Sequence, residues 1–129
     1  MLSGSCLCGA INFAAERPAR DPAACHCTQC RKQSGYHWAS VKVMDDELRI
    51  TGKPKWFAAS LTAKRGFCPT CGSFLFWRGV NDPDISIALG ALGALDGATG
   101  LRLERHIFTE DKGDYYEILG AVPQEEQET

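Results

Sequence analysis

The 129-residue sequence has no long apolar run and no excess of basic residues. Its longest apolar stretch, Ile85–Leu95, is interrupted by a serine and two glycines and is much shorter than the ~20 residues of a membrane-spanning helix. We therefore expect no membrane helix. Fourteen Lys and Arg residues against sixteen Asp and Glu residues give a formal net charge of −2. A dedicated nucleic-acid binder needs a basic surplus, so we expect small molecules or proteins as partners.

The N-terminus also lacks the features of a secretory signal. Residues 1–6 contain neither a cationic start nor a continuous apolar segment. We therefore expect a cytoplasmic protein, and the reducing conditions of the cytoplasm disfavour disulfides. The seven cysteines are moreover odd in number and could not all pair within one chain. Their spacing must have another explanation.

The length and the 44% apolar content are typical of one packed domain. Short alternating apolar segments predict a mainly β fold with short helical turns. We expect strands at residues 10–14, 38–43, 48–51, 64–67, 73–77, 85–89, 101–108 and 115–119. The helical candidate is Thr28–Ser34, followed by Gly35 as a suitable C-cap. Residues 1–122 should form the domain, and residues 123–129, with three glutamates and no apolar side chain, a disordered acidic tail.

The cysteines form three tight groups, which are Cys6 and Cys8, then Cys25, Cys27 and Cys30, then Cys68 and Cys71. A Cys-x-x-Cys turn aims two sulfurs at one ion, and a following glycine such as Gly72 lets the backbone approach closely. A closed tetrahedral zinc site needs four ligands, so seven cysteines divide into four and three. A three-cysteine site leaves one coordination position open, as in catalytic zinc sites.

The spacing leaves the division of the cysteines open. The first pair could share an ion with the last pair, or it could join Cys27 and Cys30 while Cys25 lies elsewhere. We favour the first division, because the middle three cysteines are close enough to surround one ion. A redox dithiol is a further alternative, but neither Cys-x-x-Cys motif lies in a βαβ pattern. His26 could complete the middle group, although a side chain between two ligands would project away from their ion.

Other polar candidates lie near the middle cysteines or later in the chain. Arg31 and Lys32 are either a solvated basic pair or a counter-charge and clamp for substrate carboxylates. His37 and His106 could be metal ligands, but a lone histidine in a β pattern is more often a core or surface residue. We expect most aromatic side chains to pack in the core.

Together the motifs resemble the glutathione-dependent formaldehyde-activating enzyme family, which includes centromere protein V. The similarity rests on residues 4–13, 25–32 and 67–72, with weaker support from residues 93–96, 106–108 and 115–116. The resemblance implies a zinc-binding β-tent fold with two zinc ions. It implies a structural zinc on Cys6, Cys8, Cys68 and Cys71, and a catalytic zinc on Cys25, Cys27 and Cys30.

The resemblance also implies a carbon–sulfur lyase-type enzyme similar to S-hydroxymethylglutathione synthase. Its substrates would be adducts of a small thiol such as glutathione with an aldehyde such as formaldehyde. The thiol would be the fourth ligand of the three-cysteine zinc and, once deprotonated there, could attack a carbonyl carbon. The alternative is a non-catalytic zinc-binding thiol carrier or protein-interaction module. Neither nucleic acid nor a membrane is expected as a partner.

Overall fold

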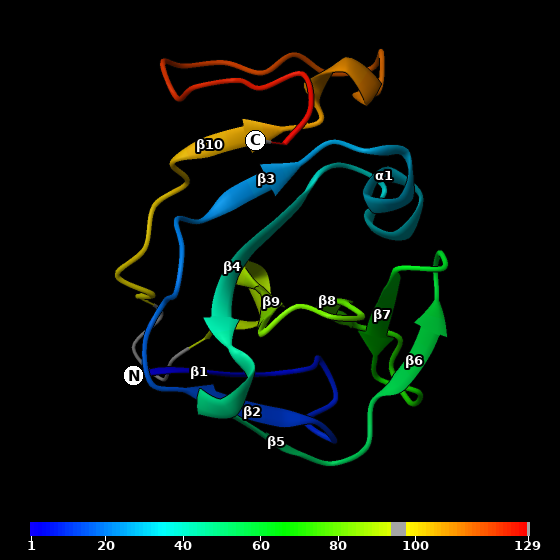
Figure 1. The fold of residues 1–129 in the computed structure, drawn as a ribbon, viewed down its shortest axis with the longest axis vertical. Coiled ribbons are helices and arrows are strands. Elements are labelled where there is room, and N and C mark those ends of the chain that lie inside the picture. The colour runs from blue at the N-terminus through cyan, green and yellow to red at the C-terminus, as the bar shows by residue number, and fades with distance from the viewer. Residues whose placement is uncertain (94–97, 129) are drawn as a thin grey trace.

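The computed structural model describes residues 1–93 and 98–128 as a mainly β protein with two sheets and one helix (Figure 1). The small sheet contains the antiparallel strands β1 (Leu2–Ser5), β2 (Asn12–Ala15) and β5 (Leu48–Thr51), in that spatial order. The large sheet contains, in spatial order, β10 (Arg105–Ile107), β3 (Ala23–Cys25), β4 (Trp38–Met44), β9 (Asp84–Ala88), β8 (Phe74–Gly79), β7 (Ala63–Phe67) and β6 (Lys55–Ala58). Short 3-10 turns lie at Asp45–Glu47, Leu89–Ala91 and Thr109–Asp111.

The large sheet is mixed, with both parallel and antiparallel strand pairs. Strands β10 and β3 are parallel, and the other neighbours that the structure describes are antiparallel. In Figure 1 the small sheet lies at one end of the molecule, while β3, β10 and helix α1 (Thr28–Ser34) lie at the other. The end that carries α1 therefore also carries the middle group of cysteines.

Helix α1 has the bounds that the sequence predicts. It spans Thr28–Ser34, and the Cys27 side chain at the N-cap accepts a hydrogen bond from the N–H of Cys30. Gly35 at the C-cap has a φ of 82°, and its N–H donates to the carbonyl of Arg31 at 2.8 Å. A left-handed residue in this position favours glycine, because a side chain would strain the backbone.

Most predicted strands are confirmed, with differences of one or two residues at their ends. The strand at residues 115–119 is wrong, because these residues form a turn and irregular structure. The strand predicted at residues 101–108 is shortened to β10. Strands β1, β3 and β6 are absent from the prediction. The first two consist largely of serine, glycine, alanine and cysteine, which give little β signal, and the pairing partners fix them instead.

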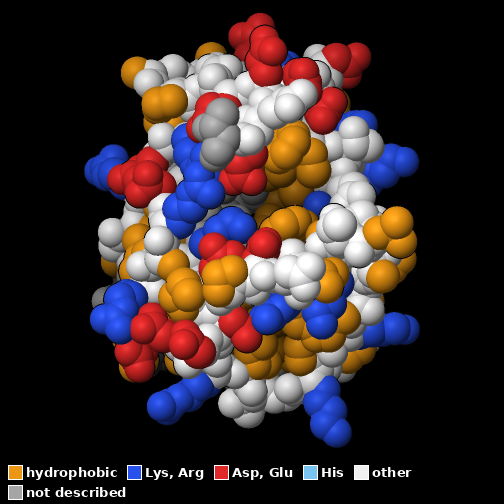
Figure 2. All heavy atoms as spheres, in the orientation of Figure 1, with side chains coloured by type: hydrophobic (Ala, Val, Ile, Leu, Met, Phe, Trp, Pro, Cys, Tyr) orange, Lys and Arg blue, Asp and Glu red, His pale blue; other side chains and the backbone are white. Residues whose placement is uncertain are grey.

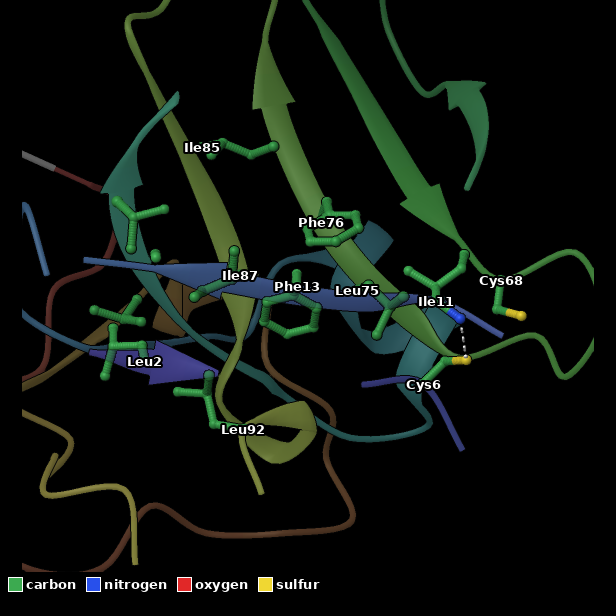
Figure 3. Packing of buried hydrophobic residues seen from close by; sticks show 13 residues of the cluster. Leu2, Cys6, Ile11, Phe13, Cys68, Leu75, Phe76, Ile85, Ile87 and Leu92 are labelled. Carbon is green, nitrogen blue, oxygen red and sulfur yellow. Dashed lines mark hydrogen bonds between the residues drawn. The ribbon is translucent and has the colours of Figure 1, made fainter. Parts of the chain in front are cut away.

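The main core lies between the two sheets (Figure 3). Phe13 on β2 packs edge-on against Phe76 on β8, with ring centroids 5.3 Å apart. Complete burial of such side chains stabilises the fold by roughly 1.5–3 kcal/mol each. Cys6 and Cys68 belong to the same cluster, and Figure 3 shows them at one end of it beside Ile11. The core thus holds the first sulfur of each outer cysteine pair in place.

Residues 123–128, here called the acidic segment, run along β10. The N–H of His106 donates to the carbonyl of Pro123, and the N–H of Glu125 donates to the carbonyl of His106, both at 2.8 Å. The structure therefore differs from the predicted disordered tail over these residues. The segment lacks apolar side chains, but backbone pairing and ion pairs with Arg105 order it. Residue 129 lies outside the described residues. No helix in the described ranges is long and apolar enough to cross a bilayer.

Candidate metal centres and the adjoining pocket

The first and last cysteine pairs meet in space. The four Sγ atoms of Cys6, Cys8, Cys68 and Cys71 all lie within 4.8 Å of one another. The Sγ atom of Cys8 lies 3.6 Å from that of Cys6 and 3.7 Å from that of Cys68. Tetrahedral zinc with Zn–S bonds of about 2.3 Å requires sulfurs about 3.8 Å apart. This group, called the four-cysteine cluster, therefore has a size that suits a closed zinc site.

Two similar turns present these four sulfurs. In the first, the N–H of Cys6 donates to the carbonyl of Ile11, and the N–H of Ile11 donates to the Sγ of Cys6 at 3.2 Å. In the second, the N–H of Cys68 donates to the carbonyl of Ser73, and the N–H of Cys71 points at the Sγ of Cys68 at 3.5 Å. N–H donors aimed at sulfur stabilise a thiolate, which is the form that binds a metal.

A glycine closes each of these turns. Gly9 and Gly72 follow the second cysteine of their pairs, with φ angles of 81° and 79°. These left-handed conformations turn the backbone around the sulfurs. The Ser73 hydroxyl, 3.2 Å from the Sγ of Cys71, lowers the pKa of that thiol to about 5. Local geometry therefore favours a thiolate at Cys71 before any ion binds, whereas desolvation and the neighbouring thiols raise the pKa of Cys8 to about 11.

The middle cysteines form a second cluster at the start of α1. Cys25 is the last residue of β3, Cys27 is the N-cap of α1 and Cys30 lies in its first turn. Their three Sγ atoms lie within 4.8 Å of one another. The pKa of Cys27 is lowered and that of Cys25 is raised, chiefly by the hydrogen bond between the two thiols. We call this group the three-cysteine cluster. Because Cys27 loses its proton readily and Cys25 retains its own, a cation is needed to hold all three residues as thiolates.

The structure thus groups the cysteines as four and three. The alternative in which the first pair joins Cys27 and Cys30 does not match this arrangement. The donor sets suit zinc, because thiolates are soft ligands and zinc accepts tetrahedral sulfur sites. The three-cysteine cluster supplies one ligand fewer than a closed site, so it could bind a metal with a coordination position open to another ligand.

Arg65 on β7 is a polar residue at the three-cysteine cluster that the sequence analysis did not identify. Its side chain is buried, and its Nη1 lies 3.5 Å from the Sγ of Cys30. It also donates to the side-chain oxygens of Gln29 at 3.1 Å and Gln33 at 2.9 Å. Among the described residues it has no carboxylate partner. A buried guanidinium needs a counter-charge, and thiolates of this cluster can provide it.

His26 lies between two cysteines of the cluster but points away from them. The ring is fully buried, and its Nδ1 forms a hydrogen bond with the Tyr116 hydroxyl at 2.7 Å. Its Nε2 forms a hydrogen bond with Nδ1 of His106 at 3.0 Å. Burial lowers the pKa of His26 to about 4, so the ring is neutral at pH 7. As expected for a side chain between two ligands, the His26 ring lies outside the cysteine cluster and binds Tyr116 and His106 instead.

The three-cysteine cluster opens into a pocket with a volume of about 380 Å³. Figure 2 shows a hollow near the middle of the face in view, with hydrophobic, Lys or Arg, and Asp or Glu side chains gathered around it. All three cysteines line the pocket, as do Trp38, Trp77 and Ile107. Its charged lining residues among those described are Arg20, Lys42, Arg65, Arg105, Asp21, Asp111 and Glu128. The pocket therefore joins a sulfur cluster to a mixed set of charged side chains, four cations and three carboxylates among the described residues.

A family model described as glutathione-dependent formaldehyde-activating enzyme matches residues 1–111. The chain belongs to this family. An uncharacterized lyase of Schizosaccharomyces pombe is 28% identical over 127 residues, which cover 92% of this chain and 86% of that protein. A crystal structure of a Rhodobacter sphaeroides protein, 21% identical, matches with a TM-score of 0.64 over 95% of this chain and 99% of that chain. It shares the fold, and the resemblance inferred from the cysteine motifs is confirmed.

The matched region of the family model contains both cysteine clusters and Arg65, but the acidic segment lies beyond it. Two residues that the sequence suggested as a carboxylate clamp, Arg31 and Lys32, are not among the described residues that line the pocket. His37 and His106 lie outside both clusters. Of the weaker family motifs, residues 94–96 lie outside the described residues, so the structure does not describe that part of the 93–96 motif.

Proposed function

We propose that this family member is a zinc-dependent carbon–sulfur lyase-type enzyme that forms or breaks adducts of a small thiol, such as glutathione, with an aldehyde such as formaldehyde. The four-cysteine cluster holds a structural zinc. The catalytic zinc is held by Cys25, Cys27 and Cys30, with the substrate thiol as fourth ligand. The observation that carries this proposal is the opening of an incomplete sulfur site into a pocket whose described lining includes four cations beside three carboxylates.

The two clusters suit different tasks because their surroundings differ. Cys6 and Cys68 are buried in the main core, so an ion there would link the small sheet to the turn before β8. The sulfurs of the three-cysteine cluster instead face the pocket, where a substrate thiol can reach them. Zinc bound at this cluster supplies a soft positive charge that keeps a substrate thiol deprotonated at neutral pH.

The reaction itself needs few groups from the protein. The thiol sulfur attacks the carbonyl carbon, a carbon–sulfur bond forms, the C=O double bond becomes a single bond, and the thiol proton ends on the oxygen. Thr28 lines the pocket next to Cys27, and its hydroxyl is our candidate donor of a hydrogen bond to that oxygen. Arg65 offsets the negative charge of the thiolates, and Trp38 stacked on Phe74 shields one side of the cluster from water.

The experiment that tests the proposal measures the rate of adduct exchange at equilibrium. Glutathione and ¹³C-formaldehyde form the adduct spontaneously, and NMR exchange spectroscopy gives the rate with and without zinc-loaded protein. The wild-type chain should bind two zinc ions and accelerate exchange. The Cys30→Ser variant should bind one and accelerate nothing, while its retained near-UV circular dichroism shows an intact fold.

A wild-type protein that binds two zinc ions and glutathione but leaves the exchange rate unchanged would overturn the enzymatic proposal. That result would identify the alternative, a non-catalytic zinc-binding thiol carrier or protein-interaction module. A zinc content of one ion per chain in the wild type would overturn the assignment of two metal sites. Testing thiols with and without carboxylates in the same assay separates a wrong thiol from a protein without turnover.

A further inference from the structure

One carboxylate in the pocket, that of Glu128, belongs to the acidic segment of the chain. Among the described lining residues there are four cations and three carboxylates. Lys42 is paired with Asp84 at 3.7 Å, and Arg65 is bound to the three-cysteine cluster. The other two cations, Arg20 and Arg105, meet at one residue of the acidic segment, Glu128.

The contacts of Glu128 are those of a bound anionic ligand. Its Oε2 lies 2.8 Å from Nη2 of Arg105 and 3.9 Å from Nη1 of Arg20. The Arg105 side chain is 12% exposed and is largely shielded from water, whereas that of Glu128 is 30% exposed and stays partly open to solvent. Glu125 also approaches Arg105, with its Oε2 3.4 Å from Nη1. Such charge-assisted contacts mark a place in the pocket that accepts a carboxylate.

Strand pairing sets the position of this place relative to the sulfurs. In the parallel register of β10 and β3, Arg105 pairs with Ala23 and Ile107 pairs with Cys25. These four residues line the pocket, whereas His106, between the two on β10, contacts His26 on the other side. Two residues along a strand span about 7 Å. A thiol bound at the cysteines therefore reaches Arg105 if its carboxylate lies only a few bonds from the sulfur.

We propose that Arg105 and Arg20 form a subsite for a carboxylate of the substrate thiol, and that Glu128 occupies this subsite in the free protein. The acidic segment is then a displaceable plug, and the protein selects thiols that carry a carboxylate over neutral thiols. That the ligand carries a thiol rests on the proposed function. The carboxylate subsite itself rests on the contacts of Arg105 and Arg20.

The attachment of the acidic segment permits this displacement. The backbone hydrogen bonds to β10 and to the turn after it involve Pro123 and Glu125. Past these residues, the contacts of the described chain are side-chain ones, namely those of Glu128 and a hydrogen bond from Gln127 to Glu110 at 3.1 Å. Glu128 can therefore leave the arginines while the backbone pairing of the segment stays in place.

Two probes separate the carboxylate subsite from the sulfur site. S-methylglutathione carries both carboxylates of glutathione but no free thiol, and 2-mercaptoethanol carries a thiol but no carboxylate. Binding of each to the zinc-loaded chain is measured by calorimetry for the wild type and for three variants. Glu128→Gln removes the carboxylate that is proposed to occupy the subsite, Arg105→Gln removes its main cation, and Glu126→Gln is the matched control. Glu126 is an exposed residue of the same segment, and its substitution by glutamine changes the net charge by the same amount as that of Glu128.

Glu128→Gln should tighten S-methylglutathione binding about threefold to tenfold, because the ligand no longer displaces a charge-assisted contact. Glu126→Gln should change it by less than twofold, and Arg105→Gln should weaken it. None of the three should alter the affinity for 2-mercaptoethanol. Equal effects of the two glutamate variants would show long-range charge and overturn the plug, as would unchanged binding in Glu128→Gln.

The result is independent of turnover. If the adduct exchange assay shows no acceleration but the S-methylglutathione response is as expected, the lyase proposal is wrong and the subsite stands. If exchange is accelerated equally for glutathione and 2-mercaptoethanol, and Glu128→Gln leaves S-methylglutathione binding unchanged, the lyase proposal stands and the subsite is wrong. Circular dichroism and zinc content confirm that each variant is folded.

Discussion

Substitution of Arg65 tests whether this side chain is the counter-charge of the three-cysteine cluster. Arg65 is 3% exposed, and its guanidinium approaches the Sγ of Cys30 at 3.5 Å. Two glutamine side chains accept its other hydrogen bonds, so the thiolates are its only partners that carry a charge among the described residues. In Arg65→Gln the cluster loses this neighbouring positive charge. Residues that support metal ligands in this way typically contribute a factor of about 10 to 100 in metal affinity, or about 1.4–2.8 kcal/mol.

The assay is competition for zinc between the protein and a chromophoric chelator, which resolves two binding steps per chain. Arg65→Gln should weaken one step about tenfold to hundredfold and leave the other unchanged, since the four-cysteine cluster does not contact Arg65. Arg65→Lys keeps the charge but not the planar guanidinium, so its zinc affinity at that step should lie between those of the wild type and Arg65→Gln. The matched control is Arg17→Gln, which removes an exposed arginine bound to Glu47 at 2.7 Å. If Arg65→Gln leaves both steps within twofold of the wild type, the counter-charge argument is refuted.

The two clusters and the buried histidine give further expectations. Cys68→Ser should lower the thermal unfolding midpoint more than Cys30→Ser, because Cys68 lies in the main core while Cys30, also buried, belongs to the smaller cluster beside the pocket; calorimetric scans of the zinc-loaded variants compare them. Tyr116→Phe should reduce the free energy of unfolding by about 0.5–1.5 kcal/mol in urea titrations, because the hydrogen bond to His26 is lost. The lowered pKa of His26, about 4, predicts a neutral ring in NMR spectra at pH 6, and its contribution to stability should be complete above pH ~6.5 and lost as the pH falls towards 4. A ring that titrates near pH 6.5 would contradict its burial.

The cysteine groups and α1 could be inferred from the sequence because their determinants are local. Within each group the cysteines are two or three residues apart, and Gly35 marks the end of the helix directly. The sequence also favoured joining the outer pairs, and the structure shows that the main core brings them together. The same local reasoning indicated that His26 would turn away from the sulfurs of its neighbours.

Arg65 and the carboxylate subsite could not be inferred in this way. Arg65 is 35 residues from Cys30 in the sequence, and only the pairing of β7 within the large sheet brings it to the cluster. Arg105 and Glu128 meet because a parallel strand pair and a segment without apolar residues lie side by side. Composition correctly shows that such a segment has little to bury, but it does not show that a neighbouring strand offers it hydrogen bonds and ion pairs.

Strand β10 lies at one edge of the large sheet, so Arg105 of the proposed carboxylate subsite stands on a different element from the cysteines. Among the described strands of that sheet, β10 pairs with β3 alone, and its Arg105 projects into the pocket two residues before the position level with Cys25. If Arg105 holds a substrate carboxylate as proposed, substitutions on β10 and in the acidic segment would change the ligand that fits, while the cysteine loops and the central strands would keep their neighbours.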